Sequence, residues 1–344
     1  MTRVLVTGAS GFIGGALTRT LIERGIQVRT LQRTKSDLLR ALEAKGVECV
    51  AASIDDEAAV VRAAEGMDAI FHVAAKAGVW GSYDSYFRAN VIGTRNVLAA
   101  CRAHAIPKLV HTSSPSVVHG GGMVEGVDES APIAATHSTP YPATKAMAEL
   151  EVLAANGEAL RDGKVLSTVA LRPHLVWGPG DANIAPRLVD RAKAGRLVLV
   201  EGGKHKIDAT HIDSAVHAHW LAYERVAPGA ACAGKAYFIA QGEPQPSRDI
   251  VLGLLRAYGV EAVPRSVSLK TAMRIGTVIE TAYRLFRIEK EPPLTRFLAE
   301  QLGTAHWYNL GAAERDLGYR APLTTEEGLR RLKAHLAETS RQAS

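Results

Sequence analysis

Three side chains of this sequence have the types and spacing needed for acid–base chemistry on an oxygen atom. Tyr141 and Lys145 are four residues apart, so they lie on one face if their segment is helical. An ammonium group near a phenol lowers the phenol pKa, which would let Tyr141 exchange a proton near neutral pH. Ser114 follows a strand-like run and could hold the same oxygen, with Ser113 and Ser116 as alternatives. We predict Ser114, Tyr141 and Lys145 as the catalytic residues.

A glycine-rich turn near the N-terminus has the spacing of a pyrophosphate site. Gly8, Gly11 and Gly14 form the pattern G-x-x-G-x-x-G between a strand-like run and a helical one. A pyrophosphate needs backbone N–H groups at close range, and the helix N-terminus attracts the anion. In this position the pattern predicts a dinucleotide-binding turn, with a purely structural tight turn as the alternative.

The end of the second predicted strand bears on which dinucleotide binds. A cofactor with a free ribose 2′-hydroxyl usually meets Asp or Glu there, but this chain has Gln32 and Arg33, with Arg29 and Lys35 nearby. A guanidinium suits a 2′-phosphate, which a carboxylate would repel. We expect NADPH/NADP+ as the cofactor and Ser10 as a second phosphate ligand. A plain surface charge is the alternative interpretation of Arg33.

These groups require a scaffold that brings them together, and the first two-thirds of the chain supplies one. Short apolar runs alternate with helical periodicity, which predicts a parallel sheet with helices on both faces. Such sheets bind ligands beyond the carboxyl ends of their strands. Strands are expected at 4–6, 27–31, 47–50, 69–73, 108–112, 166–171 and 236–239, and helices at 12–23, 37–45, 57–64 and 91–104.

The chain of 344 residues is long enough for roughly two domains. Later segments carry many Pro and Gly residues, which indicates a less regular unit. We predict an α/β protein with a Rossmann doubly wound parallel sheet and a smaller, discontinuous C-terminal substrate lobe. Residues 1–172 and 205–240 form the dinucleotide-binding domain, and residues 173–204 and 241–340 the substrate-binding lobe.

One segment of the predicted lobe is amphipathic. Between residues 270 and 288, apolar residues recur at helical spacing and arginines lie beside them. The simplest interpretation is a helix packed on the body of the protein. The alternative is a helix over an apolar substrate tunnel or at a membrane surface. The apolar positions are Ile275, Val278, Ile279, Ala282 and Leu285.

Composition excludes several other classes of protein. Apolar residues make up 47% and charged residues 22%, which is typical of a globular chain. The net charge of +6 is mild and no dense basic run occurs, so nucleic acid is not an expected partner. The N-terminus lacks the layout of a signal peptide, and Cys49, Cys101 and Cys232 are widely separated. We expect a cytoplasmic location, with membrane association as an option. None of the 12 histidines has metal-site spacing, so no metal is expected.

Several motifs together resemble the extended short-chain dehydrogenase/reductases. Residues 211–219 and 234–244 look like the 3β-hydroxysteroid/sterol-4α-carboxylate dehydrogenase branch. Residues 76–86 and 291–302 are similar to the bacterial 2-alkyl-3-oxoalkanoate reductases of long-chain olefin biosynthesis. The motifs of the wider family are Thr7-Gly8-x-x-Gly11-x-x-Gly14, Asn90-x-x-Gly93-Thr94, Thr112-Ser113-Ser114, Tyr141-x-x-x-Lys145 and Arg172-Pro173 with Gly178-Pro179-Gly180.

This resemblance implies NADPH-dependent reduction of a 2-alkyl-3-oxoalkanoate, with hydride from NADPH and the proton from Tyr141. Ser114 would hold the ketone oxygen, and Lys145 would bind the nicotinamide ribose. A hydrophobic long-chain β-keto acid is the implied substrate. Other enzymes of the pathway and a second copy in a homodimer are the expected partners. The implied cofactor residues are Gly8, Ser10, Gly11, Phe12, Ile13, Gly14, Arg33, Ser53, Ile54, Ala74, Ala75, Lys76, Tyr141, Lys145, Pro173 and Leu175, and the implied substrate residues are Trp80, Ser116 and His174.

One departure from the family pattern concerns the adenine contact. Ser53 and Ile54 stand where relatives carry Asp-Leu, so either the hydroxyl or the backbone makes this contact. Three other functions stay open: an NAD(P)-dependent sterol or steroid 3β-dehydrogenase, a sugar-nucleotide epimerase or dehydratase, and a non-catalytic NADP-binding regulator. Arg33 disfavours the NAD-using sterol enzyme, and the intact Ser114, Tyr141 and Lys145 set disfavours the regulator.

Overall fold

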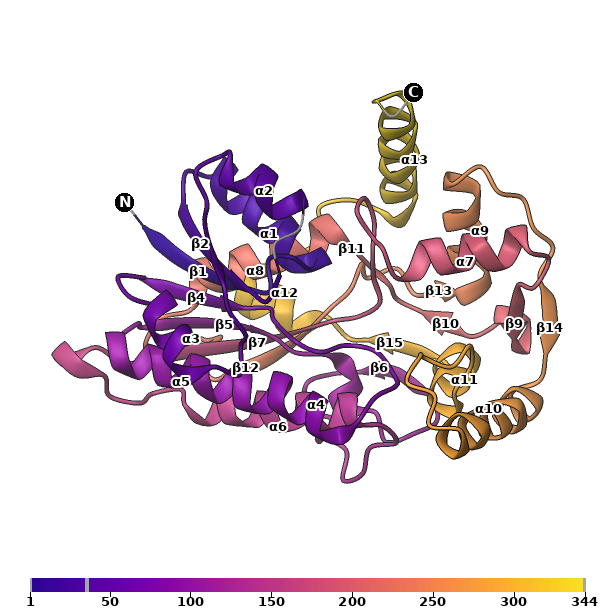
Figure 1. Ribbon diagram of the computed structural model, residues 1–344, viewed down its shortest axis with the longest axis horizontal. Coiled ribbons are helices and arrows are strands. Elements are labelled where there is room, and N and C mark those ends of the chain that lie inside the picture. The colour runs from indigo at the N-terminus through magenta and orange to yellow at the C-terminus, as the bar shows by residue number, and fades with distance from the viewer. Residues whose placement is uncertain (1, 35–36, 343–344) are drawn as a thin grey trace.

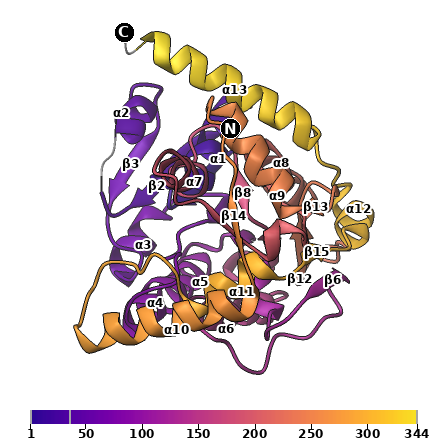
Figure 2. The same ribbon diagram turned by 90° about the vertical axis from the view of Figure 1, so that its right-hand side faces the viewer.

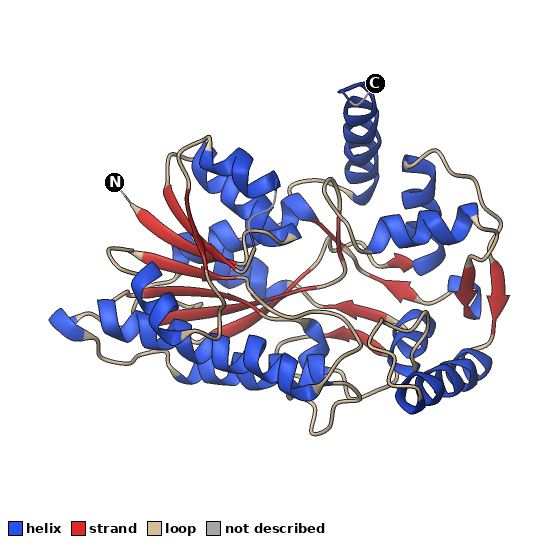
Figure 3. Cartoon of the chain, in the orientation of Figure 1, coloured by secondary structure: helices blue, strands red, loops and turns tan. Residues whose placement is uncertain are grey.

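A seven-stranded parallel sheet forms the centre of the larger part of the molecule (Figures 1 and 3). The computed structural model describes residues 2–34 and 37–342. The strand order is β12-β7-β5-β4-β1-β2-β3, so the winding reverses between β1 and β4, where such sheets bind ligands. The strands are β1 (Arg3–Thr7), β2 (Gln27–Gln32), β3 (Glu48–Ala51), β4 (Ala69–His72), β5 (Lys108–Thr112), β7 (Ser167–Pro173) and β12 (Lys235–Ile239).

Helices cover both faces of this sheet (Figure 1). The strands are apolar on both sides because both sides are buried: Val4 and Val6 pack on the α1 side and Leu5 on the α5 side. The predicted Rossmann doubly wound fold is confirmed. One face carries α1 (Phe12–Glu23), α2 (Asp37–Glu43), α8 (Ile212–Arg225) and α12 (Gly311–Leu317), and the other carries α3 (Glu57–Ala63), α5 (Gly93–His104) and α6 (Pro140–Ala154).

A smaller part of the molecule holds a four-stranded sheet in the order β13-β10-β15-β6, with two-stranded pairs β11-β8 and β14-β9. Its strands are β6 (Val124–Val127), β8 (Val176–Trp177), β9 (Val198–Val200), β10 (Lys206–Ile207), β11 (Thr210–His211), β13 (Gln245–Pro246), β14 (Arg265–Val267) and β15 (His306–Tyr308). Its helices are α7 (Ile184–Lys193), α9 (Ser247–Ala257), α10 (Leu269–Leu285), α11 (Arg296–Gly303) and α13 (Thr325–Gln342).

The two parts exchange segments more than the expected domain boundaries suggest. Strand β6 comes from residues 1–172 and β10 from residues 205–240, yet both pair in the smaller sheet. Helix α12 comes from residues 241–340, yet it packs on α8 and β12 of the larger part. The chain therefore crosses between the two parts repeatedly, and the lobe is held to the sheet at several points.

Helix α10 buries a different face from the one expected. Its buried residues are Ala272, Gly276 and Glu280, two of them small, which lets α11 approach closely. Of the five apolar positions, Ile275, Val278 and Leu285 are exposed, at 43%, 69% and 74%, and Ile279 and Ala282 are half-buried. The helix packs on the body as expected, but through its small residues rather than through the centre of this stripe. Figure 2 shows α10 along the outer edge of the molecule.

The segment between β4 and α5 is also helical. Helix α4 (Tyr83–Phe87) continues through a π-helical turn (Arg88–Ile92) into α5, so the helix predicted from residue 91 begins within this turn. Short 3-10 turns occur at Pro115–Val118, Arg161–Gly163 and Glu201–Gly203. Across the described ranges, no helix has the length and apolar character required to cross a bilayer. The same residues contain no cluster of three or more His, Cys, Asp or Glu that could hold a metal ion.

Candidate active site

The glycine turn connects β1 to α1 at the carboxyl edge of the sheet. Gly8 has a φ of +76°, and a Cβ there would lie 2.7 Å from Cα of Ala74, beyond the end of β4. A Cβ on Gly14 would overlap the carbonyl oxygen of Gly8. The N–H of Gly11 donates to the same oxygen at 2.9 Å. The inner side of the turn is therefore closed, and glycine is required there by contact with neighbouring backbone.

The outer side of the turn fits a pyrophosphate. Ser10 and Gly11 are exposed, and no side chain caps the N-terminus of α1, where Gly11 is the N-cap. The first N–H groups of a helix have no intrahelical acceptor, and the helix dipole favours an anion beside them. The described residues can thus hold a dinucleotide, with Phe12, Ile13 and Gly14 offering backbone N–H groups.

Thr7 fixes the turn against the strand beside it. Its Oγ1 accepts hydrogen bonds from the N–H groups of Val73 and Ala74, at 3.2 and 3.1 Å. It also lies 2.9 Å from Nδ1 of the buried His72. The start of the loop that follows β4, including Ala74 and Ala75, is therefore attached to the end of β1.

Asn90 attaches the same loop to α6. Its Oδ1 accepts the N–H of Lys76 at 2.7 Å, and its Nδ2 donates to Oγ1 of Thr144 at 3.0 Å. Thr144 lies in the same helix as Tyr141 and bonds to the carbonyl of Pro140 at 2.8 Å. Lys76 is thereby positioned relative to the first turn of α6.

The predicted adenosine end of the site lies at the ends of β2 and β3. Gln32 is buried; its Nε2 donates to the carbonyl of Val50 at 3.2 Å, while its Oε1 has no hydrogen-bond partner. Arg33 is exposed at the edge of the sheet. Lys35 lies outside the described residues. The last residue of β2 is thus a neutral amide and the next one a guanidinium. Neither would repel a 2′-phosphate, and the guanidinium can bind one.

Ser53 and Ile54 stand at the predicted adenine contact. The hydroxyl of Ser53 donates to the carboxylate of Asp55, so the proton of this hydroxyl is already used within the chain. Ile54 is 8% exposed, and its side chain packs against Gly93 at the start of α5. Its carbonyl accepts a hydrogen bond from Asn96 at 3.0 Å.

Ser114 and Tyr141 meet at the carboxyl end of β5. Tyr141 lies in the first turn of α6, next to Pro140 and Pro142, where a missing proline N–H costs little. The Ser114 side chain lies near enough to Tyr141 to lower the pKa of the phenol, and its Oγ lies 2.8 Å from Oγ of Ser116. Two predicted catalytic groups are therefore neighbours, with Ser116 supporting the serine.

Lys145 faces β5 rather than the phenol. Its Nζ donates to the carbonyl of Thr112 at 2.6 Å and lies 3.3 Å from Nε2 of His111. We expected the ammonium to lower the pKa of Tyr141, and this is wrong for the protein alone: burial raises the pKa of Tyr141, and the opposing, smaller effect comes from the hydrogen bond with Ser114. The reason is that Lys145 bonds to the strand.

Burial lowers the pKa of Lys145 to about 8, and Glu149, one turn further along α6, acts against this shift. Glu149 is itself fully buried and forms a two-pronged ion pair with Arg172, with Nε 2.9 Å from Oε2. Arg172 lies on the neighbouring strand β7. The ion pair ties α6 to the sheet directly behind the predicted catalytic helix turn.

Three buried histidines back the site, and sequence reasoning did not assign them this place. Burial lowers the pKa of His72 to about 3 and of His219 to about 4, and the pKa of His111 lies well below its usual value for the same reason. His219 Nε2 lies 2.7 Å from Oγ1 of Thr112. All three are uncharged near neutral pH. The sequence offered a signal for two of them: His72 and His111 are polar residues at the ends of the apolar strands β4 and β5. His219 lies in α8 and has no such signal.

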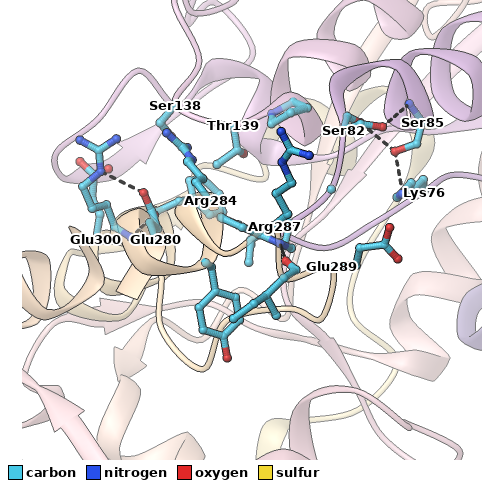
Figure 4. Close-up of a pocket in the computed structure, with 18 of the residues that line it drawn as sticks. Lys76, Ser82, Ser85, Ser138, Thr139, Glu280, Arg284, Arg287, Glu289 and Glu300 are labelled. Carbon is cyan, nitrogen blue, oxygen red and sulfur yellow. Dashed lines mark hydrogen bonds and ion pairs between the residues drawn. The ribbon is translucent and has the colours of Figure 1, made fainter. Parts of the chain in front are cut away.

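A cavity of about 790 Å³ opens beside the start of α6. Figure 4 shows it between the loop after β4, the segment before α6 and the C-terminal part of α10. Trp80, a predicted substrate residue, lines it, as does Lys76. Ser116 lies beside Ser114. His174 is instead buried against His306 and Tyr308, and its Nδ1 donates to the carbonyl of Asp208 at 2.8 Å.

Residues 5–270 match the model of the 3-beta hydroxysteroid dehydrogenase/isomerase family. The chain belongs to this family. Among its members, a 2-alkyl-3-oxoalkanoate reductase of Stenotrophomonas maltophilia is 53% identical over 337 residues, covering 97% of this chain and 99% of the relative. A protein of the same name from Shewanella oneidensis is 43% identical, covering 98% of this chain and 87% of the relative.

Solved structures show the same fold. The structure of MoeE5 in complex with UDP-glucose and NAD has a TM-score of 0.74 with 24% identity, covering 99% of this chain and all of that one (100%). At this identity the likeness concerns the arrangement of the sheet and its helices, which agrees with the topology described above.

Proposed function

We propose that this protein is an NADPH-dependent ketoreductase that converts a 2-alkyl-3-oxoalkanoate into the 2-alkyl-3-hydroxyalkanoate, a step in long-chain hydrocarbon formation. Two family members with this activity in their names match nearly the whole chain. The glycine turn, the contact between Ser114 and Tyr141, and a cavity beside α6 support the proposal. The reduced dinucleotide, when bound at the turn, supplies the hydride.

The residues of the chain hold the oxygen and move its proton. Ser114 donates a hydrogen bond to the ketone oxygen, and Tyr141 transfers its phenolic proton to that oxygen as negative charge develops there. Burial raises the pKa of Tyr141, so the phenol holds its proton until negative charge on the ketone oxygen makes that oxygen the stronger base. Lys145, held beside Thr112, binds the nicotinamide ribose.

Arg33 favours NADPH over NADH in this proposal. Its guanidinium is exposed where the 2′-phosphate would lie, and the preceding position carries the neutral Gln32. Ser10, also exposed, adds a hydroxyl to the same phosphate. A charge-assisted hydrogen bond of this kind contributes about 1.5–3 kcal/mol.

The proposal rests on the position of Tyr141 in the first turn of α6, near Ser114 at the carboxyl end of β5. Tyr141→Phe removes the proton and keeps the ring. We expect kcat to fall by about a hundredfold or more, with NADPH binding retained in a fluorescence titration. Tyr83→Phe is the matched control, because Tyr83 is 52% exposed and its hydroxyl donates to Sδ of Met147 at 3.7 Å. A Tyr141→Phe enzyme as active as the Tyr83→Phe enzyme would refute the assignment.

A further inference from the structure

The cavity beside α6 contains positive charge that the proposed proton transfer does not use. Of the four cations that line it, only Arg296 has an ion-pair partner in the described part of the chain, Glu280 at 3.3 Å. The other three, Lys76, Arg284 and Arg287, have no carboxylate within ion-pair distance among the described residues. Lys76 is half-buried and the two arginines are exposed, so all three can bind an anion that enters the cavity from solvent.

The cavity wall carries the four cations and three carboxylates, Glu280, Glu289 and Glu300, which leaves an excess of one positive charge. Glu280 accepts the backbone N–H of Arg296 at 2.7 Å as well as its side chain. Glu300 accepts the N–H of Gly122 at 2.9 Å. Glu289 is exposed and forms no ion pair with a described cation. Two of the three acidic groups are therefore engaged with other partners.

Lys76 lines the cavity and is connected to the predicted catalytic helix through Asn90. Its backbone N–H is bound by Asn90, which also bonds to Thr144, three residues after Tyr141. Its Nζ donates to Oγ of Ser85 at 2.7 Å and lies 4.9 Å from the ring centre of Tyr86. One ammonium proton is thus used, which leaves the others for a ligand.

Arg284 and Arg287 close the cavity from the α10 side. Figure 4 shows Arg284, on α10, and Arg287, just beyond the end of this helix, reaching toward the segment of Ser138 and Thr139, which directly precedes α6. The guanidinium of Arg284 lies 5.9 Å from the ring centre of Trp80. Trp80 in turn donates from Nε1 to the carbonyl of Ile288 at 3.1 Å, so the loop after β4 and the end of α10 form one wall.

The remaining lining is apolar enough for hydrocarbon chains. Val79 and Trp80 come from the loop after β4, and Met273 and Phe297 come from α10 and α11. A ligand that fits this cavity carries negative charge toward the cations and apolar chains toward these residues. A sterol supplies the apolar surface but no anion.

We propose that Lys76, Arg284 and Arg287 form a carboxylate-binding subsite, and that this subsite makes the enzyme select ionised 3-oxo or 3-hydroxy acids over neutral ketones, esters and sterols. The inference rests on the proposed function and specifies its substrate class. A carboxylate in the cavity gains a charge-assisted hydrogen bond from each of these cations that it reaches and Coulomb attraction from the others. A neutral ligand of the same shape leaves them unpaired, and a site built for a polar group discriminates strongly against a ligand that lacks it.

The test compares an acid with its methyl ester. The stable 2-alkyl-3-hydroxyalkanoate and its ester, with the same alkyl chains, are oxidised with NADP+ by the wild type, by Lys76→Gln and by an Arg284→Gln, Arg287→Gln double variant. We expect the wild-type kcat/KM to be higher for the acid. The acid-to-ester ratio should fall about tenfold or more in both variants. Arg274→Gln is the control, because Arg274 is exposed on α10 and does not line the cavity.

The outcomes separate this inference from the proposed function. Equal wild-type activity on acid and ester, or a ratio unchanged in both variants, overturns the subsite and leaves the reductase in place. If the wild type turns over neither compound, the proposed function fails, and calorimetric binding of the two compounds to the NADP+-loaded protein decides the subsite. Tighter binding of the acid, lost in the variants and kept in Arg274→Gln, supports it; equal binding refutes it.

Discussion

The two walls of this site are built in different ways. The dinucleotide wall consists of backbone at the carboxyl edge of one sheet, and its glycines are fixed by contact with neighbouring backbone. The cavity wall consists of side-chain ends from a loop and from α10 and α11, which are far apart in the sequence. A change in the first wall should affect every substrate alike, because it moves backbone. A change in the second should affect which substrate is accepted.

The largest effect is expected at Lys145, whose side chain is bonded to the backbone of β5 at the same edge of the sheet as the first wall. Its folded pKa is about 8, below the ordinary value of 10.5. Below pH 8 the folded protein carries the full cost of the buried charge, and this cost disappears as the pH rises to 10.5. The stability of the wild type relative to Lys145→Met should therefore increase over this interval, by at most about 3 kcal/mol.

Urea titrations of both proteins at intervals from pH 7.5 to 10.5 measure this difference. Only the difference between the two proteins is informative, because other lysines and tyrosines titrate in the same range. Parallel stability curves would mean that Lys145 is not buried as described.

The glycine turn offers a test of close backbone contact. In Gly14→Ala the new methyl group would overlap the Gly8 carbonyl oxygen. We expect a loss of about 1–3 kcal/mol in the free energy of unfolding, together with weaker binding of the dinucleotide. In Gly15→Ala, the new atom meets mainly the end of the Leu38 side chain, which can move. Thermal unfolding with and without NADPH compares the two, and similar losses in both would contradict the argument.

Arg33 tests whether one exposed side chain selects the dinucleotide. We expect Arg33→Ala to raise the KM for NADPH about tenfold and to leave the KM for NADH nearly unchanged. Steady-state kinetics with both cofactors on one substrate give the result. An equal rise for both cofactors would show that Arg33 acts on the turn as a whole rather than on a 2′-phosphate.

The smallest effect is expected on the outer face of α10. Ile275 is 43% exposed and does not line the cavity, whereas Met273 does. Met273→Asp should lower kcat/KM for long-chain substrates by about tenfold, since it places a charge against alkyl chains. Ile275→Asp should leave the dependence on chain length unchanged. If the two substitutions act alike, the cavity is not where the chains bind.

The sequence was sufficient for the larger part of the fold because its signals are local. Alternating apolar runs and helical periodicity predicted the strands of the parallel sheet, and the glycine spacing predicted the turn after β1. The small sheet escaped prediction because β10 and β13 are two residues long and pair across distant segments. Such strands have no periodicity of their own.

Side-chain direction was the other feature that the sequence could not provide. The spacing of Tyr141 and Lys145 placed both on α6, yet the ammonium bonds to β5. The apolar stripe of α10 looked like a packing face, but Ala272 and Gly276 pack instead because α11 lies against them. Both outcomes depend on which neighbour is present, and one sequence does not contain that information.

One assay separates a ketoreductase from a sterol dehydrogenase: the wild-type protein is given a 2-alkyl-3-oxoalkanoate with NADPH or NADH, and a 3β-hydroxysterol with NAD+ or NADP+. We expect rapid NADPH oxidation with the oxo acid, slower reaction with NADH, and negligible turnover of the sterol. Sterol oxidation with NAD+ and no reaction with the oxo acid would contradict the proposed function.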